Sequence, residues 1–370
     1  MKKLVVNKED LKNNIEKVQA LAGDKTKVIA VVKGNGYGLG LVEYSKYLVS
    51  NGIDFLAVGT LEEGVSLRKA EIKEDILMLS GTYVEDDLKM MIENDLIITL
   101  SSTEACRAVA KLSIQLGKEV RVHVKIDTGF GRYGFLYDDI ETIIKVVNGE
   151  YFGNKSNVKI EGIYSHYSLA YYKKSESAEE QSLRFKDVLR GLSKANVEYG
   201  IAHICNSPGF LNFPDMKLNA VRVGSAFVGR VDCPNTIGLK RIGELKTNVV
   251  EMKIVPKGFN IGYLDTYKTK RDTELAIVPL GYLEGFNLGN KQDMFRFVDN
   301  LRAIVQGIKK ILKKQKLQVS INNKNYDVIG KVGMYHLTID VTGGDVELGD
   351  EVILQVNPLL VDKDIVREYI

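Results

Sequence analysis

The feature of the sequence that most constrains its fold is a repeated alternation of short apolar runs with longer amphipathic stretches. The apolar runs are rich in β-branched residues, which is typical of strands that are buried on both faces. The stretches between them, such as Asp10 to Leu21 and Ala178 to Ala195, are long enough to connect parallel strands through helices. Eight such runs occur, namely Val28 to Val32, Phe55 to Gly59, Ile76 to Leu79, Leu96 to Leu100, Val120 to Asp127, Ile160 to His166, Ile201 to Ser207 and Ala220 to Gly224.

This alternation predicts an α/β fold. Eight strand–helix units over about 230 residues fit a TIM-like (β/α)8 barrel, which typically needs about 250 residues. A doubly wound sheet is the alternative, because that fold requires no particular number of strands. After about residue 240 strands follow one another without helices, which indicates a mostly antiparallel domain. We therefore expect a barrel over residues 9–240 and a mostly β C-terminal domain over residues 241–370, joined by an N-terminal strand within residues 1–8.

The C-terminal region contains one exception to its strand pattern. From Met294 to Lys316 the apolar residues keep helical spacing, with lysines outside, so we expect one helix there, which looks like an insertion. Its lysines either contact an anionic surface or form an ordinary solvated face, and the absence of interleaved aromatic residues favours the solvated face. The expected strands of this region are Thr247 to Ile254, Leu275 to Leu280, a hairpin from Val319 and Glu351 to Val356.

Charge and cysteine content exclude several function classes. The 51 Lys and Arg residues nearly balance the 48 Asp and Glu residues, and the resulting net charge of +3 argues against a nucleic-acid partner. The three cysteines, Cys106, Cys205 and Cys233, form no CxxC motif or Cys/His cluster, so we expect neither a disulfide framework nor a metal site. Because no apolar stretch of about 18 residues occurs, we expect a soluble cytoplasmic protein without a membrane partner.

In a barrel of this kind the active site is built from residues at the ends of strands, and these ends are polar here. The first run ends at Lys33. A lysine at this place either extends into solvent or is a desolvated amine whose lowered pKa lets it form an imine with an aldehyde. Tyr37 offers a hydroxyl group nearby. Four glycines leave room for a ligand, namely Gly34, Gly36, Gly38 and Gly40.

The last two runs end with residues that suit a phosphate group. Arg222 lies in the eighth run, and Gly224 and Ser225 begin the segment after it, where free backbone N–H groups at a helix start bind anions. Ser207 before Pro208 either adds a hydroxyl donor or marks an ordinary turn. The fifth run ends near Lys125, Asp127 and Arg132. The sixth ends at His166, and a single histidine at a strand end is more often structural than catalytic.

These strand ends resemble the barrel motifs of the alanine racemase family, the fold-type III enzymes that depend on pyridoxal 5′-phosphate. The matching segments, in order, are VVKGNGYGLG, HVKIDTGFGRYGF, EGIYSHYS, HICNSPG and VRVGSAFVG. In the second domain NIGYLDTY, VPLGYLEG and GKVGMYH resemble further blocks of the same family. The resemblance spans nearly the whole chain up to about residue 340.

The resemblance implies a role for each matching residue of the barrel. Lys33 corresponds to the lysine that binds the cofactor and acts as one catalytic base. Arg222 corresponds to the arginine that faces the pyridine nitrogen, and because a guanidinium does not give up its proton, this nitrogen stays unprotonated and quick reprotonation of the substrate is favoured. The cofactor-binding residues implied in this way are Lys33, Tyr37, Arg132, His166, Ser207, Arg222, Gly224 and Ser225.

The resemblance also assigns residues to the substrate. Arg132 corresponds to an arginine that contacts the cofactor and the substrate carboxylate, and Lys125 to a lysine that is carbamylated in several members and then holds that arginine. Racemisation requires a second base on the opposite face of the α-carbon. Tyr263 corresponds to this base, supplied by the neighbouring subunit of a head-to-tail homodimer with composite sites. Tyr282 and Met334 correspond to residues at the substrate entrance and the carboxylate.

Several departures from the family pattern bear on the substrate. Val228-Gly229, Leu283-Glu284-Gly285 and Met334-Tyr335 replace the usual residues, and the sequence ends at Ile370 without the family's last tyrosine segment. A shortened gate would either widen the pocket for larger amino acids or mark weak or altered activity. The resemblance itself implies a racemase that interconverts L- and D-alanine and supplies D-alanine for peptidoglycan of the cell wall, and this is the function we expect. The alternatives are a racemase or epimerase of serine, lysine or another amino acid, a non-catalytic cofactor-binding protein, and a fold-type III decarboxylase, whose glycine-triplet phosphate motif is not visible.

Overall fold

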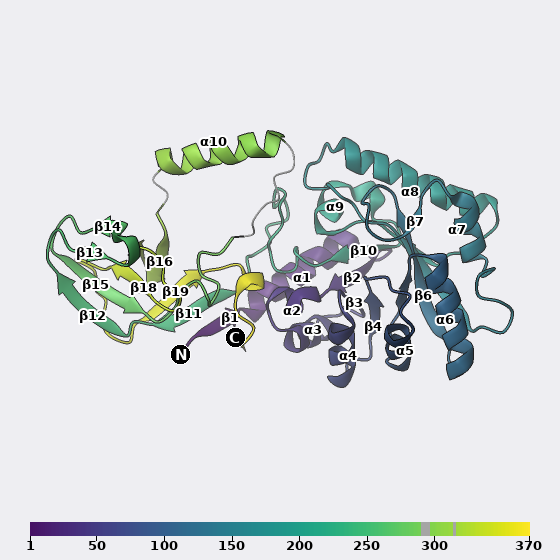
Figure 1. The fold of residues 1–370 in the computed structure, drawn as a ribbon, viewed down its shortest axis with the longest axis horizontal. Helices are drawn as coiled ribbons and strands as arrows, with labels where there is room; N and C mark the ends of the chain where they lie inside the picture. Colours follow the sequence, from purple (N-terminus) through teal and green to yellow (C-terminus); the bar gives the residue numbers. More distant parts are fainter. Residues whose placement is uncertain (290–296, 314–315) are drawn as a thin grey trace. The chain divides into compact units, whose positions relative to one another are not determined.

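The chain folds into two compact units. A computed structural model describes residues 1–289, 297–313 and 316–370. One unit is Lys8–Ile242, and the other combines Met1–Asn7 with Gly243–Ile370 (Figure 1). Each unit has its own sheet, and each is described separately below.

The first unit is built around eight parallel strands, which follow each other in the order β4-β3-β2-β10-β9-β8-β6-β5. A bridge between Leu77 and Ile97 joins the two outer strands, because the Ile97 N–H donates to the carbonyl of Ile76 at 2.8 Å. The ring is thus nearly closed, which confirms the expected (β/α)8 barrel and excludes an open doubly wound sheet. The strands are β2 Lys27–Val31, β3 Phe55–Val58, β4 Asp75–Met78, β5 Ile98–Leu100, β6 Val120–Asp127, β8 Val158–Tyr164, β9 Ile201–His203 and β10 Ala220–Val223.

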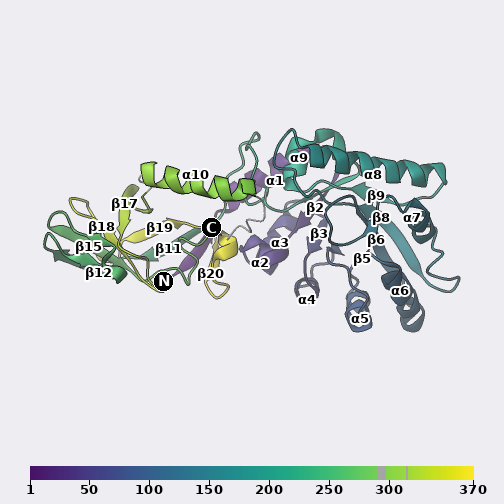
Figure 2. The same ribbon diagram turned by 45° about the horizontal axis from the view of Figure 1, so that its top comes forward.

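Helices connect these strands and lie outside them (Figures 1 and 2). Several begin at a side chain that accepts a backbone N–H bond, as at Ser102 before α6 and Ser175 before α8. Thr60 and Glu63 form a capping box at the start of α4. The helices are α1 Lys8–Ala22, α3 Leu41–Ser50, α4 Leu61–Lys69, α5 Glu85–Glu93, α6 Thr103–Leu116, α7 Ile140–Val147, α8 Glu176–Lys194 and α9 Ser207–Asn212, and a short strand β7, Phe135–Leu136, pairs with β6.

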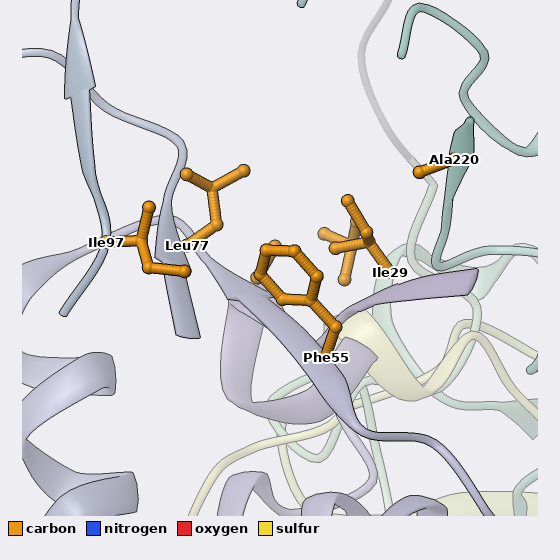
Figure 3. Packing of buried hydrophobic residues seen from close by; sticks show 7 residues of the cluster. Ile29, Phe55, Leu77, Ile97 and Ala220 are labelled. Atoms are coloured by element: carbon orange, nitrogen blue, oxygen red, sulfur yellow. The ribbon is translucent and has the colours of Figure 1, made fainter. Parts of the chain in front are cut away.

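One side of the barrel interior is apolar. Figure 3 shows labelled side chains of β2, β3, β4 and β10, with Ile97, converging between the strands. Because alternate residues of a strand face the same side, Ile29 and Val31 of β2 point the same way, and Ala220 of β10 points the same way as Arg222. Arg222 therefore continues one of the rows of side chains that form the core, and Lys33 follows β2 by two residues. The packed residues are Ile29, Val31, Phe55, Ala57, Leu77, Ile97 and Ala220.

The second unit is a nine-stranded sheet with the order β12-β15-β18-β17-β16-β19-β11-β1-β20. All its neighbours are antiparallel except β1 and β20, which are parallel, and this confirms the mostly β C-terminal domain. The strands are β1 Lys3–Val6, β11 Glu244–Asn248, β12 Glu251–Val255, β15 Thr273–Val278, β16 Gln318–Ile321, β17 Lys324–Ile329, β18 Leu337–Asp340, β19 Glu351–Gln355 and β20 Val366–Tyr369, with a separate pair β13 Asn260–Ile261 and β14 Tyr267–Lys268.

Some expected strands of this unit have different limits. The single strand expected from Thr247 to Ile254 is two strands, β11 and β12, which pair with different partners. The hairpin expected from Val319 is β16 and β17, joined at Asn322 and Asn323, whose positive φ angles of 49° and 60° are typical of a two-residue hairpin turn. The strands β18 and β20 were not expected.

Helix α10, Phe297–Lys313, confirms the expected helix within the described residues. Met294, the expected first residue, lies outside the described residues, and Lys316, the expected last residue, is described but lies after the helix. The periodicity predicts the helix but not its environment. The described apolar residues of α10 with large side chains are exposed, namely Phe297, Leu301, Ile304, Val305 and Ile308. Among the described residues no helix is long and apolar enough to cross a membrane.

Candidate active site

Lys33 lies directly after β2, at the end of the barrel where the strands finish. The segment α2, Lys33–Tyr37, is a left-handed turn, because Gly34, Asn35, Gly36 and Tyr37 have φ angles of 66°, 53°, 64° and 53°. Such a run is accessible mainly to glycine and asparagine, which explains the glycine-rich sequence after Lys33. The turn holds the Lys33 and Tyr37 side chains on the same short loop.

The Glu63 carboxylate fixes this turn. One of its oxygens accepts the backbone N–H groups of Gly34 at 2.7 Å and Asn35 at 3.4 Å, and the other accepts those of Gly59 at 2.9 Å and Thr60 at 3.3 Å. Glu63 therefore connects the ends of two neighbouring strands. The sequence analysis did not single it out, although the Thr60-x-x-Glu63 spacing of a capping box was a visible signal.

The environment of Lys33 changes the basicity of its amine. The Lys33 side chain is exposed, but the atoms around it remove part of the water from its amine. This desolvation is the largest cause of a lowered pKa of Lys33, the positive charges of Arg132 and Arg222 lower this pKa further, and Glu63 opposes them. A lysine whose pKa is lowered holds a larger neutral fraction at physiological pH and is a better nucleophile toward a carbonyl group.

Three of the residues expected to bind phosphate lie together in the barrel. The Ser207 hydroxyl oxygen accepts the backbone N–H groups of Gly224 at 3.0 Å and Ala226 at 3.2 Å. A Cβ atom on Gly224 would lie 2.4 Å from the Tyr37 hydroxyl oxygen, so only glycine lets that hydroxyl approach the backbone. Ser225 follows in the same loop. Burial raises the pKa of Tyr37 to about 12, which keeps its hydroxyl protonated and able to donate to an anion.

Arg222 is the centre of a buried polar network. Its Nη1 contacts His203 Nδ1 at 2.5 Å, and its Nη2 donates to the Ser165 carbonyl at 2.7 Å and contacts His166 Nδ1 at 3.0 Å. Burial lowers the pKa of Arg222 to about 10, so the guanidinium remains positively charged at neutral pH. Within this network His166 is a hydrogen-bond partner of Arg222.

The loop after β6 positions Arg132. The Asp127 carboxylate accepts the backbone N–H groups of Gly129, Phe130, Gly131 and Arg132 at 2.8 to 3.2 Å. Burial raises the pKa of Asp127, but these backbone hydrogen bonds outweigh burial, and the pKa is lowered overall. The Arg132 guanidinium lies 4.3 Å from the centre of the Phe130 ring, and its side chain is exposed to an incoming ligand.

Lys125 is buried between positive charges. Burial is the main cause of a pKa well below the usual value for lysine, and Arg222 and Arg132 lower it further. Its amine donates to the carbonyl of Ile126 at 3.1 Å and lies 4.9 Å from the centre of the Tyr164 ring. A lowered pKa increases the neutral fraction of this amine, and the neutral amine is the form that can attack carbon dioxide.

The second unit brings Tyr263, Tyr282 and Met334 into one region of its own fold. Tyr263 begins the turn η2, Tyr263–Asp265, in which Leu264 has a φ angle of 63°, and its side chain is 70% exposed. A Cβ atom on Gly262 would lie 3.1 Å from the Lys331 backbone nitrogen, so this turn lies beside the segment that leads to Met334. The Leu283 N–H donates to the Met334 carbonyl, which places the residue after Tyr282 next to Met334.

Comparison with known proteins covers almost the entire chain. The family described as alanine racemase, N-terminal domain, matches residues 6–231, and the family described as alanine racemase, C-terminal domain, matches residues 242–363. The chain belongs to the alanine racemase family. An alanine racemase of Methanococcus maripaludis is 32% identical over 349 residues, covering 92% of this chain and 85% of that protein. One of Halothermothrix orenii is 33% identical over 348 residues, covering 93% and 84%.

Solved structures of the alanine racemase family have the same fold. The structure of alanine racemase from Clostridium difficile 630 has a TM-score of 0.85 at 26% identity and covers all of this chain and 95% of that one. The structure from E. faecalis has a TM-score of 0.83 at 26% identity, covering 100% and 98%. The family match thus includes both units, the barrel with Lys33 and the β unit with Tyr263.

Within this alanine racemase fold the sequence analysis missed three polar residues of the site. Glu63 supports the Lys33 turn, and His203 and His123 extend the Arg222 network. His203 lies in the segment HICNSPG, but nothing in that segment indicates its partner, since His123 is 80 residues away along the chain. Among the described residues no cluster of three or more His, Cys, Asp and Glu side chains is suited to hold a metal ion.

Proposed function

We propose that this protein is an isomerase, a racemase that interconverts L- and D-alanine with pyridoxal 5′-phosphate as cofactor. The observation that carries the proposal is the position of Lys33 within a chain that matches the alanine racemase family over both units. Lys33 has a lowered pKa and lies on the loop whose Tyr37 hydroxyl approaches Gly224. An aldehyde cofactor with a phosphate group requires this combination of a nucleophilic amine and small, polar neighbours.

The residues at the barrel mouth fit the cofactor. Lys33 would hold it covalently, and Tyr37, Ser207, Gly224 and Ser225 would bind its phosphate through hydroxyl and backbone N–H groups. Arg222 would face the pyridine nitrogen, with His166 beside it. When bound, the cofactor makes the proton on the substrate α-carbon more acidic by drawing electrons away from that carbon.

Arg222 restrains the chemistry that the cofactor can perform. With a pKa of about 10 in its buried site, Arg222 stays a cation at neutral pH and donates hydrogen bonds without giving up a proton. A pyridine nitrogen held opposite Arg222 would therefore receive no proton from it, and the cofactor would withdraw electrons less strongly. This arrangement favours rapid return of a proton to the α-carbon over side reactions such as transamination.

We propose two bases for the proton transfers, since removal from one face and delivery to the other cannot both be performed by one lysine. Lys33 serves one face of the α-carbon and Tyr263 of the partner subunit serves the other, in a homodimer with composite sites. The exposure of Tyr263 on the short turn η2 supports its availability to another copy of the chain. Arg132 would bind the substrate carboxylate, with Met334 on the carboxylate side and Tyr282 at the substrate entrance. Carbamylation of Lys125 would place a negative charge that holds Arg132.

The buried position of Glu284 bears on the choice of substrate. Glu284 is one of the residues that differ from the family pattern, but its carboxylate accepts the backbone N–H of Gly281 at 2.8 Å and pairs with Lys2. Glu284 therefore stabilises its own turn. Its departure from the family pattern gives no reason to prefer serine or lysine over alanine as the substrate. Free thiols at Cys106, Cys205 and Cys233 fit a reducing compartment, and we propose the cytoplasm as the site of D-alanine supply for peptidoglycan.

The test is a chiral assay of the purified enzyme supplied with pyridoxal 5′-phosphate. L-alanine and D-alanine are incubated separately, and the enantiomers are resolved at intervals until both reactions reach the same mixture. Single enantiomers of serine and lysine form the comparison panel, and the Lys33→Ala variant is the control. Racemisation of alanine at the highest rate is expected. A faster reaction with another amino acid would reassign the substrate, and cofactor binding without any racemisation would favour a cofactor-binding protein.

A further inference from the structure

A row of four polar side chains runs through the barrel interior behind Lys33. His123 of β6 contacts His203 of β9, His203 contacts Arg222 of β10, and Arg222 contacts His166 after β8. We propose that His123 is a positioning residue that fixes the hydrogen-bonding state of His203 and thereby orients Arg222. The role in catalysis rests on the function proposed above, whereas the hydrogen-bonding states can be measured without it.

The contacts occupy both ring nitrogens of His203. His203 Nε2 lies 3.0 Å from His123 Nδ1, and His203 Nδ1 lies 2.5 Å from Arg222 Nη1. His123 is 1% exposed, His203 0% and Arg222 3%, so water does not substitute for any of these partners. In a buried site of this kind, each nitrogen must be matched with a group of the opposite hydrogen-bonding type.

The proton positions in this row follow from both sides of His203, because a guanidinium only donates hydrogen bonds and His123 offers an acceptor nitrogen to the proton of His203. His203 Nδ1 must accept from Arg222, so the proton of a neutral His203 is on Nε2 and is donated to His123. His123 Nδ1 must then accept, and its own proton is on Nε2. By the same reasoning His166 Nδ1 accepts from Arg222, and the His166 proton is also on Nε2.

The electrostatic surroundings support three neutral histidines. Burial is the largest cause that lowers the pKa of His123, to about 3, and the positive charge of Arg222 is the next. The same two causes bring the pKa values of His203 and His166 well below the usual value for histidine. A second proton on His203 would also set one donor against another at Arg222.

Packing fixes the two rings of His123 and His203. A Cβ atom on Gly162 would lie 2.6 Å from Cε1 of His123, so glycine at this position of β8 makes the space that the His123 ring fills. The Tyr164 ring stacks on His203 with centroids 4.8 Å apart and planes 2° apart, and the edge of Phe55 meets His123 at 5.9 Å. The rings cannot turn freely, so His123 holds an acceptor in place for His203.

The first experiment measures the tautomers directly. The chain has four histidines, and the fourth, His336, is exposed, so a histidine-labelled holoenzyme gives only four imidazole groups in nitrogen-15 NMR. Single substitutions assign the signals. We expect His123, His166 and His203 to be neutral with the proton on Nε2, unchanged between about pH 6 and 8. A proton on Nδ1 of His203, or a cationic His203, would overturn the proposal.

The second experiment separates positioning from packing. His123→Asn keeps an acceptor oxygen close to the position of Nδ1, whereas His123→Leu has nearly the same size and no acceptor. We expect His123→Asn to retain the His203 tautomer and kcat within about threefold, and His123→Leu to lower kcat about tenfold with KM for alanine changed less than about twofold. Equal kcat values and equal His203 signals in the two variants would contradict the assignment.

The NMR measurements also separate a failure of the proposed racemase function from a failure of the positioning role of His123. If the protein failed to racemise any amino acid, the function proposed above would be wrong, but the His203 signals of the His123→Asn and His123→Leu variants would still decide whether His123 fixes His203. If either variant failed to fold, a proton on Nδ1 of His203 in the unaltered holoenzyme would still overturn the proposal, and a proton on Nε2 would support it.

Discussion

The two halves of the candidate site differ in how firmly their own chain holds them. In the barrel, Lys125, Ser207 and Arg222 are buried, and the side chain of each makes hydrogen bonds to neighbouring residues. In the β unit, Tyr263 and Met334 lie on turns and are 70% and 55% exposed. The comparison teaches that the folding of a single chain holds these three barrel residues in place, while Lys33 and Arg132 of the same half remain exposed. In the β unit, the exposure of Tyr263 fits its proposed supply to a second copy of the chain.

The largest effect is expected in the barrel half, at Lys33. Lys33→Ala removes both the amine that would hold the cofactor and one of the two bases, so racemisation should fall by about 10⁴-fold or more. The measurement is the chiral alanine assay, together with borohydride reduction and peptide mass mapping to find the residue that carries the cofactor. Lys69→Ala, at an exposed lysine of α4, is the control and should leave both unchanged.

The next largest loss of activity is expected in the exposed half, at Tyr263. Tyr263→Phe removes only a hydroxyl group, and loss of a proton donor should lower kcat by about 10² to 10⁴-fold while the absorbance of the bound cofactor is retained. The matched control is Tyr199→Phe, at a tyrosine that precedes β9 and so lies at the end of the barrel away from the strand ends that carry the site, and this variant should keep its activity. Full racemisation by Tyr263→Phe would remove Tyr263 from the mechanism.

Substitutions in the barrel half should lower the free energy of unfolding more than substitutions in the exposed half. Arg222→Met leaves the carbonyl of Ser165 and the acceptor nitrogens of two histidines buried without their donor, at a cost of about 1 to 3 kcal/mol for each group. We expect the free energy of unfolding to fall by at least about 3 kcal/mol. Met334→Ala should change it by less than about 0.5 kcal/mol, because that side chain is exposed. Chemical denaturation of both variants is the measurement, and equal losses would show that the halves do not differ.

A smaller effect concerns the pH dependence of cofactor attachment to the apoenzyme. The attacking amine must be neutral, so the rate should rise with pH and reach its midpoint below 10.5, because desolvation and then Arg132 lower the pKa of Lys33. Arg132→Gln removes a positive charge and raises this pKa, and the rate at neutral pH should fall about two- to fivefold. Arg107→Gln, on the exposed face of α6, should leave the profile unchanged. A midpoint that does not move with Arg132→Gln would contradict this cause.

The sequence predicted the parts of the site that depend on local order. All eight barrel strands were found, because buried parallel strands are short apolar runs, and the positions of Lys33 and Arg222 follow from their places at strand ends. The family resemblance, confirmed by the comparisons, covers both units. What escaped prediction depends on contacts between distant segments. His123 and His203 meet only because β6 and β9 lie on either side of β8 in the barrel.

The β unit shows a second kind of limit. The run from Thr247 to Ile254 looks like one strand, but its two parts pair with β19 and β15, and only the pairing of the folded sheet reveals the break. Helix α10 was predicted from its periodicity, which indicates a helix but does not say whether another element covers its apolar side.

The most direct test of the difference between the halves is complementation between two inactive variants. Lys33→Ala and Tyr263→Phe are mixed under conditions that let subunits exchange, and the alanine racemase activity is measured. If each site takes Lys33 from one subunit and Tyr263 from its partner, random exchange in a twofold dimer should restore about one quarter of the unaltered activity. Mixing Lys33→Ala with Arg222→Met, both in the barrel, should restore none. Failure of the first mixture to recover activity after proven exchange would contradict the composite site.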